Sequence, residues 1–353
     1  MVILAIDVGK GTEDIMIYKP NQNIENAIQV VWPSSAQIMY QTLLTTKKSP
    51  ILIDGGIMGG EPWHKILYEK SKAPNTVFMT RIAAKSLKYN LKFVEEKGVN
   101  IVSQAELDEM DGLRLTTSDI NWDRINWLLK SNNIDHSQVD KILLACQDHG
   151  ESSDPNEKSK DFRMKAIYEK LDDNGQLSDL LVQGASIPEY LPRHKAIFED
   201  AAKNFKGIGK SHIYIMDSSP AVILGAYRKQ KQELIVNIGN GHTLAVVVES
   251  NLVKAIYETH TGGVEKNQFF ADIDLLVKNS LSHEEAQKRG AHGVYIREKV
   301  TSNTLSDFYP FTLIGPNRSR IANQHSFLAH PGGSMMMAGP IGLINALNKS
   351  DNK

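Results

Sequence analysis

The sequence predicts an α/β protein made of two related lobes, and three observations lead to this prediction. The chain has 353 residues, more than the roughly 250 to 300 at which single hydrophobic cores stop growing. A run of three strands with a glycine-containing turn occurs near residue 9 and again near residue 239. The composition, with 41% hydrophobic and 23% charged residues, is that of a globular protein able to bury a large core.

The first copy of the pattern opens with three apolar, β-branched runs joined by short polar connections, which predicts an antiparallel meander. Helical spacing and short solid apolar runs then predict a helix, a strand, a helix and a strand. These seven elements are expected at residues 2–6, 15–18, 27–32, 122–129, 141–146, 192–205 and 212–216.

The second copy repeats this order, again with a glycine-rich turn between its first two strands. Its three hairpin strands are followed by a helix, two further strands and a helix-like segment. The expected ranges are residues 234–237, 243–248, 252–257, 266–281, 312–314, 325–328 and 338–347. We therefore expect two lobes that face each other.

Residues 50–104 do not fit the repeated pattern and are expected to form an inserted α/β unit in the first lobe. Strands are predicted at residues 51–53, 77–79 and 99–102, with helices between them. The turn DGGIMGGEPW in this unit allows an anion site at a helix N-terminus. The alternative is that these glycines are needed only for the backbone conformation of a strand-to-helix turn. Both interpretations stay open.

Charge and cysteine content exclude several classes of function. Lys and Arg number 40 against 41 Asp and Glu, so a net charge of -1 gives no long-range attraction to a polyanion, and we expect neither nucleic acid nor membrane partners. The apolar run at residues 2–6 is too short for a signal or spanning segment, which favours a cytoplasmic protein. The single cysteine, Cys146, cannot supply the roughly four ligands of an iron–sulfur cluster.

The first turn, IDVGKGT, has the residues of a phosphate and cation site. Gly9 and Gly11 permit a turn that exposes successive amide groups, and Asp7 at the end of an apolar strand offers a carboxylate to hydrated Mg²⁺. Lys10 and Thr12 add a charge and a hydroxyl group. The alternative is a tight hairpin that needs glycine for its shape alone.

The second turn, VNIGNGHTLA, has the same strand, Gly-x-Gly turn and hydroxyl group at the same place in the second copy. Repetition in register favours a functional interpretation of both turns. Asn237 replaces the leading acid and supplies no charge, so a metal would depend mainly on Asp7. His242 is positioned for a hydrogen bond to phosphate, or is an exposed turn residue.

Six segments in order resemble the superfamily of actin, heat-shock chaperone ATPases and sugar kinases. IDVGKGT and NIGNGHT resemble its two phosphate loops, and THTGGVEK resembles the Gly-Gly segment that follows the second loop. SSPAVILGA, which follows Asp217, and AGPIGLINAL resemble its two interdomain helices, and FTLIGPNRSRI resembles its adenosine-binding strand and turn. The resemblance implies two ribonuclease H-like lobes, at residues 1–218 and 219–353, with the last helix, 338–348, packing back at the hinge between them.

The resemblance also implies ATP and Mg²⁺ as cofactors, with Asp7 as the metal ligand through water. It assigns the phosphate and nucleoside contacts to Gly9, Lys10, Gly11 and Thr12, to Asn237, Gly239, Asn240, Gly241, His242 and Thr243, and to Gly262, Gly263, Gly315 and Asn317. Small residues of the two connecting helices, Ala221, Gly225, Gly339 and Gly342, would let those helices pack closely at a hinge. Asn237 and Pro316 depart from the superfamily pattern, so binding is better supported than hydrolysis.

The segment LLACQDHGES places polar residues where a buried strand ends at the expected cleft. It is similar to a Gln-x-His-Gly segment of sugar kinases, which makes Gln147, Asp148 and His149 candidates for the substrate or water side. A carboxylate there acts as a general base or positions the attacking group. The alternative is that Asp148 and His149 cap a solvent-facing turn.

MGGEPW, ACQDHGES and NIGNGHTLA together resemble a family labelled as pyruvate formate-lyase activating enzymes. The radical chemistry in that label needs a cysteine-bound cluster, which one cysteine does not provide. A structural zinc site is also not expected, because His64, His149, His242 and His260 show no His-x-x-x-His spacing.

Three functions remain after these exclusions. The first is an ATPase or small-molecule kinase that transfers the γ-phosphate to water or to a small hydroxylated acceptor in the cleft between lobes. The second is a nucleotide-operated switch that acts on a partner protein, and the third is a nucleotide-binding scaffold without hydrolysis. The fold does not choose among them, because one fold hosts all three.

Overall fold

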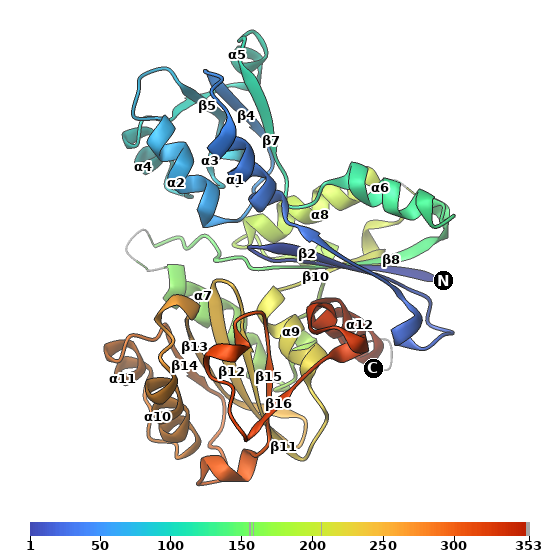
Figure 1. Cartoon of the computed structure of the whole chain (residues 1–353), viewed down its shortest axis with the longest axis vertical. Coiled ribbons are helices and arrows are strands. Elements are labelled where there is room, and N and C mark those ends of the chain that lie inside the picture. The colour runs from blue at the N-terminus through green and yellow to red at the C-terminus, as the bar shows by residue number, and fades with distance from the viewer. Residues whose placement is uncertain (155–156, 158, 206, 351–353) are drawn as a thin grey trace.

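The computed structural model describes residues 1–154, 157, 159–205 and 207–350 of the chain. Three β-sheets organise this part of the protein, two of six strands and one of four. Figure 1 shows the four-stranded sheet and its helices at one end of the molecule, the second six-stranded sheet at the other end, and the first between them. Among the described helices, none combines the length and apolar character needed to cross a membrane.

The first sheet has the strand order β3-β2-β1-β8-β10-β9. Strands β1, β2 and β3 form an antiparallel meander, while β8 and β10 continue from β1 in parallel and β9 closes the edge antiparallel to β10. The bounds are β1 Val2–Val8, β2 Thr12–Tyr18, β3 Ile28–Pro33, β8 Val139–Cys146, β9 Val182–Gln183 and β10 Ile213–Met216.

The second sheet repeats this arrangement, with the order β14-β13-β12-β11-β15-β16. Strands β11, β12 and β13 form the meander, and β15 and β16 continue from β11 in parallel. The bounds are β11 Gln232–Ile238, β12 His242–Glu249, β13 Leu252–His260, β14 Gly293–Ile296, β15 Phe311–Ile314 and β16 Ser326–Leu328. The predicted pair of ribonuclease H-like lobes, the fold of actin-like ATPases, is confirmed by this shared strand order.

The third sheet belongs to the inserted unit and is entirely parallel, in the order β6-β5-β4-β7. Its strands are β4 Ile51–Gly55, β5 Val77–Thr80, β6 Asn100–Val102 and β7 Leu113–Thr117. The expected range of 50–104 is therefore too short, because β7 pairs with β4 along its whole length. The alternating apolar and polar residues of LRLTT indicate a strand. Its partner β4, however, is distant in the sequence, so the pairing could not be predicted from the local pattern.

Twelve α-helices cover the sheets and join the lobes over the described residues. Their bounds are α1 Ser35–Thr45, α2 Glu61–Lys70, α3 Arg81–Ala84, α4 Leu91–Glu96, α5 Gln104–Asp108, α6 Trp122–Ser131, α7 Ser159–Tyr168, α8 Pro192–Asn204, α9 Ser218–Ala226, α10 Lys266–Val277, α11 His283–Lys288 and α12 Ala338–Ser350. The helix expected at residues 266–281 ends at Val277, because Asn279 adopts a positive φ of 56° that closes the helix.

Helices α9 and α12 pack directly on each other between the lobes, as the small residues predicted. A Cβ atom on Gly225 would lie 1.9 Å from the carbonyl oxygen of Ala338, and one on Gly342 would lie 1.8 Å from that of Ala221. Only glycine fits at these two crossing points. One hydrophobic core runs from the inner face of the first sheet through these helices to the inner face of the second.

Candidate functional site

Strand alternation directs one polar residue of each lobe toward the other lobe. Ile3 and Ala5 of β1 belong to the inner core, whereas Leu4 and Ile6 pack against the outer helices. Because side chains alternate along a strand, Asp7 shares the inner face with Ile3 and Ala5. Strand β11 repeats this pattern, with Ile235 in the inner core, so Asn237 is the counterpart of Asp7.

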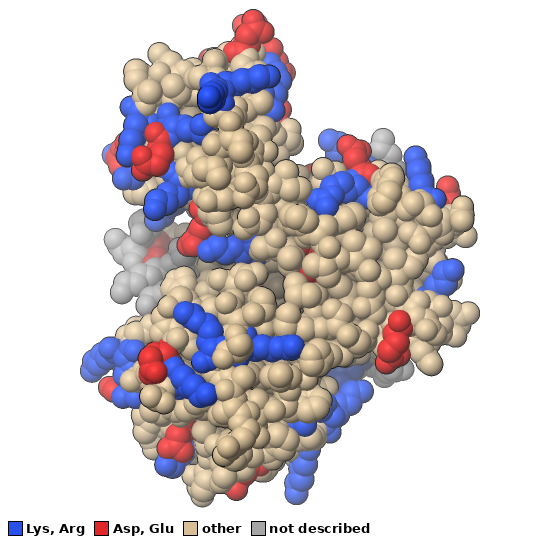
Figure 2. Space-filling model, in the orientation of Figure 1, with Lys and Arg blue, Asp and Glu red and all other residues tan. Residues whose placement is uncertain are grey.

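A cavity of about 1410 Å³ lies between the two lobes and the inserted unit. Its walls come from the β1–β2 and β11–β12 turns, the ends of β8 and β15, the segments that follow β4 and α3, and the first residues of α9 and α12. Figure 2 shows the molecule hollowed between the inserted unit and the second lobe. Acidic and basic side chains are both scattered over this face.

The two glycine turns have the same backbone geometry. The amide of Gly9 donates to the carbonyl oxygen of Thr12 at 2.8 Å, and the amide of Gly239 donates to that of His242 at 3.0 Å. Each hydrogen bond closes its own hairpin, and the two bonds lie at equivalent positions of the two copies. The duplication therefore extends from the sheet order to the conformation of the turns.

The turns also meet across the cavity. A Cβ atom on Gly11 would lie 2.8 Å from Nδ2 of Asn240, and one on Gly241 would lie 3.8 Å from Cδ of Lys10. Lys10 extends from its turn to the inserted unit, where its Nζ donates to Oε2 of Glu61 at 3.1 Å. The two turns thus bring backbone from both lobes to one place, where free amide groups would suit a polyphosphate.

Two buried carboxylates lie on opposite strands beneath the first turn. Asp7 pairs directly with Asp14 in the β1–β2 register, and both side chains line the cavity. Their exposed fractions are 4% and 8%, and within the described residues the Oδ1 atoms of both have no hydrogen-bond partner. Burial raises the pKa of Asp7 to about 7 and that of Asp14 to about 8, and the negative charge of Asp7 adds to the rise at Asp14.

The first turn of α12 closes the other side of Asp7. A Cβ atom on Gly339 would lie 2.0 Å from Oδ2 of Asp7, so a side chain at this position would displace the carboxylate. The predicted role of Gly339 in close packing is therefore extended: it makes room for a cavity carboxylate.

At the end of β8, the structure separates the three candidates Gln147, Asp148 and His149. Asp148 is fully buried, and its carboxylate accepts hydrogen bonds from the amides of Gly150, Arg193 and His194 at 2.9, 2.9 and 3.0 Å, and from the Tyr89 hydroxyl at 3.2 Å. Both oxygens are occupied, and one of them caps amides in the first turn of α8. Asp148 therefore caps backbone amides, as in the capping alternative, but it does so in a buried turn and not in a solvent-facing one.

Gln147 and His149 are available to a ligand. The Nε2 atom of Gln147 is buried and, in the part of the chain that the structure describes, makes no hydrogen bond. The His149 ring lines the cavity with its centroid 5.8 Å from that of His242 in the other lobe. An unpaired buried amide costs free energy, which favours a polar ligand near Gln147.

A buried ion pair that the sequence did not indicate lies beside Gln147. Arg193 donates through Nε to Oδ2 of Asp119 at 2.7 Å and through Nη2 to Oδ1 at 2.8 Å, and its Nη1 donates to the carbonyl oxygen of Gln147. Arg193 and Asp119 line the cavity but are separated by 74 positions in sequence. No local motif could have joined them. Asp14, in contrast, could have been predicted from the sequence, because it lies directly opposite Asp7 across the first hairpin.

The structure brings most of the sequence candidates to the cavity wall. These are Asp7, Gly9, Lys10, Thr12, Gln147, Asp148, His149, Asn237, Gly239, Asn240, Gly241, His242, Gly262 and Gly315. Gly11, Thr243, Gly263 and Asn317 lie outside that wall.

Three of the residues outside the wall still have identifiable places. The buried hydroxyl of Thr243 is 3.0 Å from that of Thr261, so it is engaged within the second lobe. Asn317 donates through Nδ2 to the carbonyl oxygen of Gly239 at 3.0 Å, which supports the second turn from behind. Gly11 lies against the opposite turn.

Gly315, on the wall, has a backbone conformation that favours glycine. Its φ is 98°, and a Cβ atom there would lie 2.4 Å from the carbonyl oxygen of Ile238. The turn after β15 therefore approaches the end of β11 closely, beside the second glycine turn.

Comparison with known families gives one match, over residues 58–320, to the family described as "Putative pyruvate format-lyase activating enzyme (DUF1786)". The matched range covers the ends of β8 and β15, the second turn and most of the inserted unit. No curated protein matches the sequence significantly.

Several solved structures resemble the chain at low identity. Ethanolamine utilization protein EutJ from Carboxydothermus hydrogenoformans is 11% identical over 98% of this chain and 89% of its own, with a TM-score of 0.34. The Lmo2764 protein from Listeria monocytogenes, described as a "putative N-acetylmannosamine kinase", is 8% identical over 99% and 100%, with a TM-score of 0.35. An exopolyphosphatase from Cytophaga hutchinsonii is 10% identical over 99% and 89%, with a TM-score of 0.30. The fold assignment itself depends on the strand order of the two sheets.

Proposed function

We propose that this chain, which belongs to the family described as "Putative pyruvate format-lyase activating enzyme (DUF1786)", is a magnesium-dependent ATP-binding protein. It would transfer the γ-phosphoryl group to water or to a small hydroxylated acceptor. One observation carries this proposal. Two hairpin turns of the same conformation, one from each lobe, meet across a cavity beneath which lies a pair of buried carboxylates.

The phosphate chain of ATP fits between the two turns. The amides of Gly9 and Gly239 close the hairpins themselves, so the amides that follow them in each turn would contact the phosphates, with Lys10 as the nearby cation. The nucleoside would lie toward the second-lobe wall of the cavity, which is lined by Gly262, Gly315 and Pro316. ATP binding then holds the two lobes together.

The residues present fit a hydrated Mg²⁺ ion. Mg²⁺ is commonly held by one or two carboxylates while it keeps several waters. Asp7 and Asp14 supply two carboxylates on one face, each with an oxygen that lacks a partner among the described residues. A cation there would offset the cost of two adjacent buried carboxylates, and Mg²⁺ supplies charge neutralisation of the phosphates when bound.

Gln147 is the best-placed residue to orient the attacking group. Its unpaired Nε2 lies in the wall of the cavity, and the Arg193 side chain fixes its backbone by donating to the Gln147 carbonyl oxygen. Asp148 is assigned a positioning role instead of that of general base, because its two oxygens already accept four hydrogen bonds. This assignment replaces the general-base alternative for Asp148 in the proposed mechanism.

The radical activity named in the family description is not proposed for this chain. An iron–sulfur cluster is generally held by about four cysteine thiolates, and the sequence contains one cysteine. That residue, Cys146, is buried in β8, where its side chain packs in the core behind the sheet. Its place in the fold is that of a small hydrophobic residue.

Calorimetric titration with ATP and Mg²⁺, followed by phosphate-release assays with and without a panel of hydroxylated metabolites, tests the proposal. We expect Mg²⁺-dependent binding and turnover, and loss of turnover by at least about tenfold in Asp7→Asn. Asp123→Asn on the exposed surface of α6 is the matched control and is expected to behave as the unchanged protein. Absence of ATP binding would refute the proposal. ATP binding without turnover would refute phosphoryl transfer and would favour a nucleotide-binding scaffold.

A further inference from the structure

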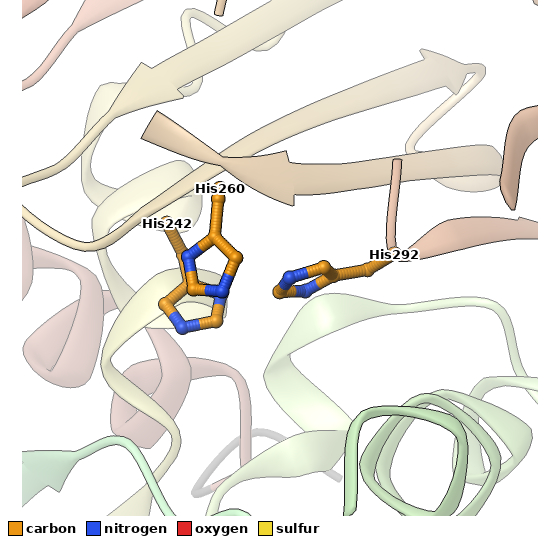
Figure 3. Close-up of side chains that lie close together, drawn as sticks. All are labelled: His242, His260 and His292. Atoms are coloured by element: carbon orange, nitrogen blue, oxygen red, sulfur yellow. The ribbon is translucent and has the colours of Figure 1, made fainter. Parts of the chain in front are cut away.

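Three histidines of the second lobe converge at one edge of its sheet, where they line the cavity between the lobes. His242 begins β12, His260 ends β13, and the two are direct partners in the antiparallel register. His292 immediately precedes β14, and its amide donates to the carbonyl oxygen of Glu258 at 2.8 Å. Figure 3 shows the three rings gathered around a common space.

The spacing of the three rings suits a single metal ion. One ring nitrogen of each histidine lies within 4.8 Å of those of the other two. The ring centroids of His260 and His292 are 4.5 Å apart, and each lies 5.0 Å from that of His242. Zinc–nitrogen bonds of about 2.0 to 2.1 Å require the three ligand nitrogens to lie closer together than this upper limit of 4.8 Å. The rings would therefore turn slightly toward one another when a metal binds.

An oxygen atom lies near Nδ1 of each ring, at hydrogen-bond distance for His242 and His260 and somewhat farther away for His292. Nδ1 of His242 lies 3.0 Å from Oε1 of Glu258, Nδ1 of His292 lies 3.9 Å from the same atom, and Nδ1 of His260 lies 3.4 Å from the carbonyl oxygen of Gly241. With Nδ1 directed to oxygen, Nε2 of each ring would be the atom offered to a metal. Metal-binding histidines generally direct their second nitrogen to a carboxylate or carbonyl group in this way.

The carboxylate behind the histidines is itself held in place. Glu258 is fully buried, accepts a hydrogen bond from the Tyr168 hydroxyl at 3.2 Å, and forms an ion pair with Arg163. Arg163 also pairs with Asp217 at 3.0 Å, next to the start of α9. These contacts fix the position of Glu258 for the rings in front of it, although Nε of Arg163 and Oδ2 of Asp217 have no hydrogen-bond partner among the described residues.

We propose that His242, His260 and His292 bind one divalent transition-metal ion of the zinc class, with an open coordination position that faces the cavity. Three imidazoles suit zinc, cobalt or nickel better than magnesium or calcium, which prefer oxygen ligands. Three protein ligands instead of four also distinguish an open site from a closed structural one.

The site lies beside the second glycine turn and faces His149 of the first lobe, whose ring centroid is 5.8 Å from that of His242. The open position would therefore bind a water molecule or an anionic oxygen of a ligand in the cavity. This inference does not depend on ATP binding, because all three ligands and their carboxylate partner belong to the second lobe. The sequence contains no His-x-x-x-His signal for the site because strand pairing assembles it.

Metal titration of the full chain tests the proposal without nucleotide. The protein is first stripped with a chelator, then titrated with Zn²⁺ by competition calorimetry and with Co²⁺ by visible absorption. We expect one Zn²⁺ per chain and an intense Co²⁺ d–d spectrum of a nitrogen-rich, four-coordinate site. His260→Ala is the first variant, because His260 is exposed and its replacement removes little packing.

We expect His260→Ala and His292→Ala to weaken zinc binding at least about 100-fold, and Glu258→Gln to weaken it about 10- to 100-fold as a partner behind the ligands. His330→Ala, an exposed histidine outside the cluster, is the control and should leave affinity unchanged. Circular dichroism verifies that each variant is folded. Absence of stoichiometric zinc binding, or binding that the folded His260→Ala variant retains in full, overturns the proposal.

Discussion

Replacing Asp14 with asparagine is predicted to stabilise the metal-free protein at pH 8 while it weakens the response to Mg²⁺. Asp14 lies opposite Asp7 on the β1–β2 hairpin, and both carboxylates are buried. Burial, and then the charge of Asp7, raise the pKa of Asp14 from 3.8 to about 8. The folded state therefore holds a proton on this group that the unfolded chain releases above about pH 4.

The sign and size of the effect follow from this difference. Stability conferred by the protonated carboxyl group is complete below pH 3.8 and declines as the pH rises toward 8. The difference of about four pKa units corresponds to roughly 6 kcal/mol at about 1.4 kcal/mol per unit. Asparagine carries no charge at any pH, and its amide can donate to Asp7. Asp7 remains buried in the variant and still destabilises the folded state. We therefore expect Asp14→Asn to recover about half of this free energy of unfolding, roughly 2 to 3 kcal/mol at pH 8.

Urea denaturation at pH 5 and pH 8, each with a chelator or with Mg²⁺, measures this prediction. The stabilising effect of Asp14→Asn should be larger at pH 8 than at pH 5 by more than about 1 kcal/mol, because the protonated carboxyl group loses its contribution over the roughly three pH units between the two conditions. Added Mg²⁺ should stabilise the unchanged protein more than the variant, because binding to the folded state alone stabilises it. Equal effects at the two pH values, or a variant that Mg²⁺ stabilises as strongly, would refute the reasoning.

Three further predictions concern the turns, the β8 end and the hinge. Gly11→Val places a side chain where Nδ2 of Asn240 would lie 2.8 Å from its Cβ, so ATP affinity measured by calorimetry is expected to fall markedly with little change in stability. Asp148→Ala removes the acceptor of four hydrogen bonds, two of them buried, and should lower the free energy of unfolding by about 3 kcal/mol in urea, whereas Asp148→Asn should lose less. Gly342→Ala directs a methyl group against the carbonyl oxygen of Ala221, so the unfolding midpoint should fall, with a loss of about 1 to 3 kcal/mol. An unchanged midpoint in Gly342→Ala would show that the helix pair is not rigid at this crossing.

The fold could be predicted because its signals are local and occur twice. Apolar runs mark each strand of the two meanders, and glycine pairs mark both first turns. Strand β7 was left out of the inserted unit although LRLTT alternates as a strand does, because its partner β4 lies about sixty residues earlier and no local pattern identifies that pairing. Strand β14 was missed for the same reason, since it is the outer strand beside β13.

The site was predictable where it depends on hairpins and was not where it depends on long-range packing. Asp7 and the turn residues follow from the motif, and the position of Asp14 follows from the register of the same hairpin. The pairing of Arg193 with Asp119 requires α8 to lie beside the inserted unit, which no local pattern encodes. His292 reaches His242 and His260 only after three strands align at their ends.

The two candidate metal sites have opposite chemical character, which allows each to be tested in the presence of the other. Asp7 and Asp14 supply oxygen atoms from the first lobe, which suit Mg²⁺, whereas the three histidines supply nitrogen atoms from the second lobe, which suit zinc. Millimolar Mg²⁺ is therefore expected to leave zinc on the histidines, and Asp14→Asn to leave zinc affinity unchanged. In the same way, His260→Ala should retain the Mg²⁺-dependent rise in thermal stability. If either substitution abolished both responses, the two donor sets would form one site, and the lobes would have to close further than they do here to bring them together.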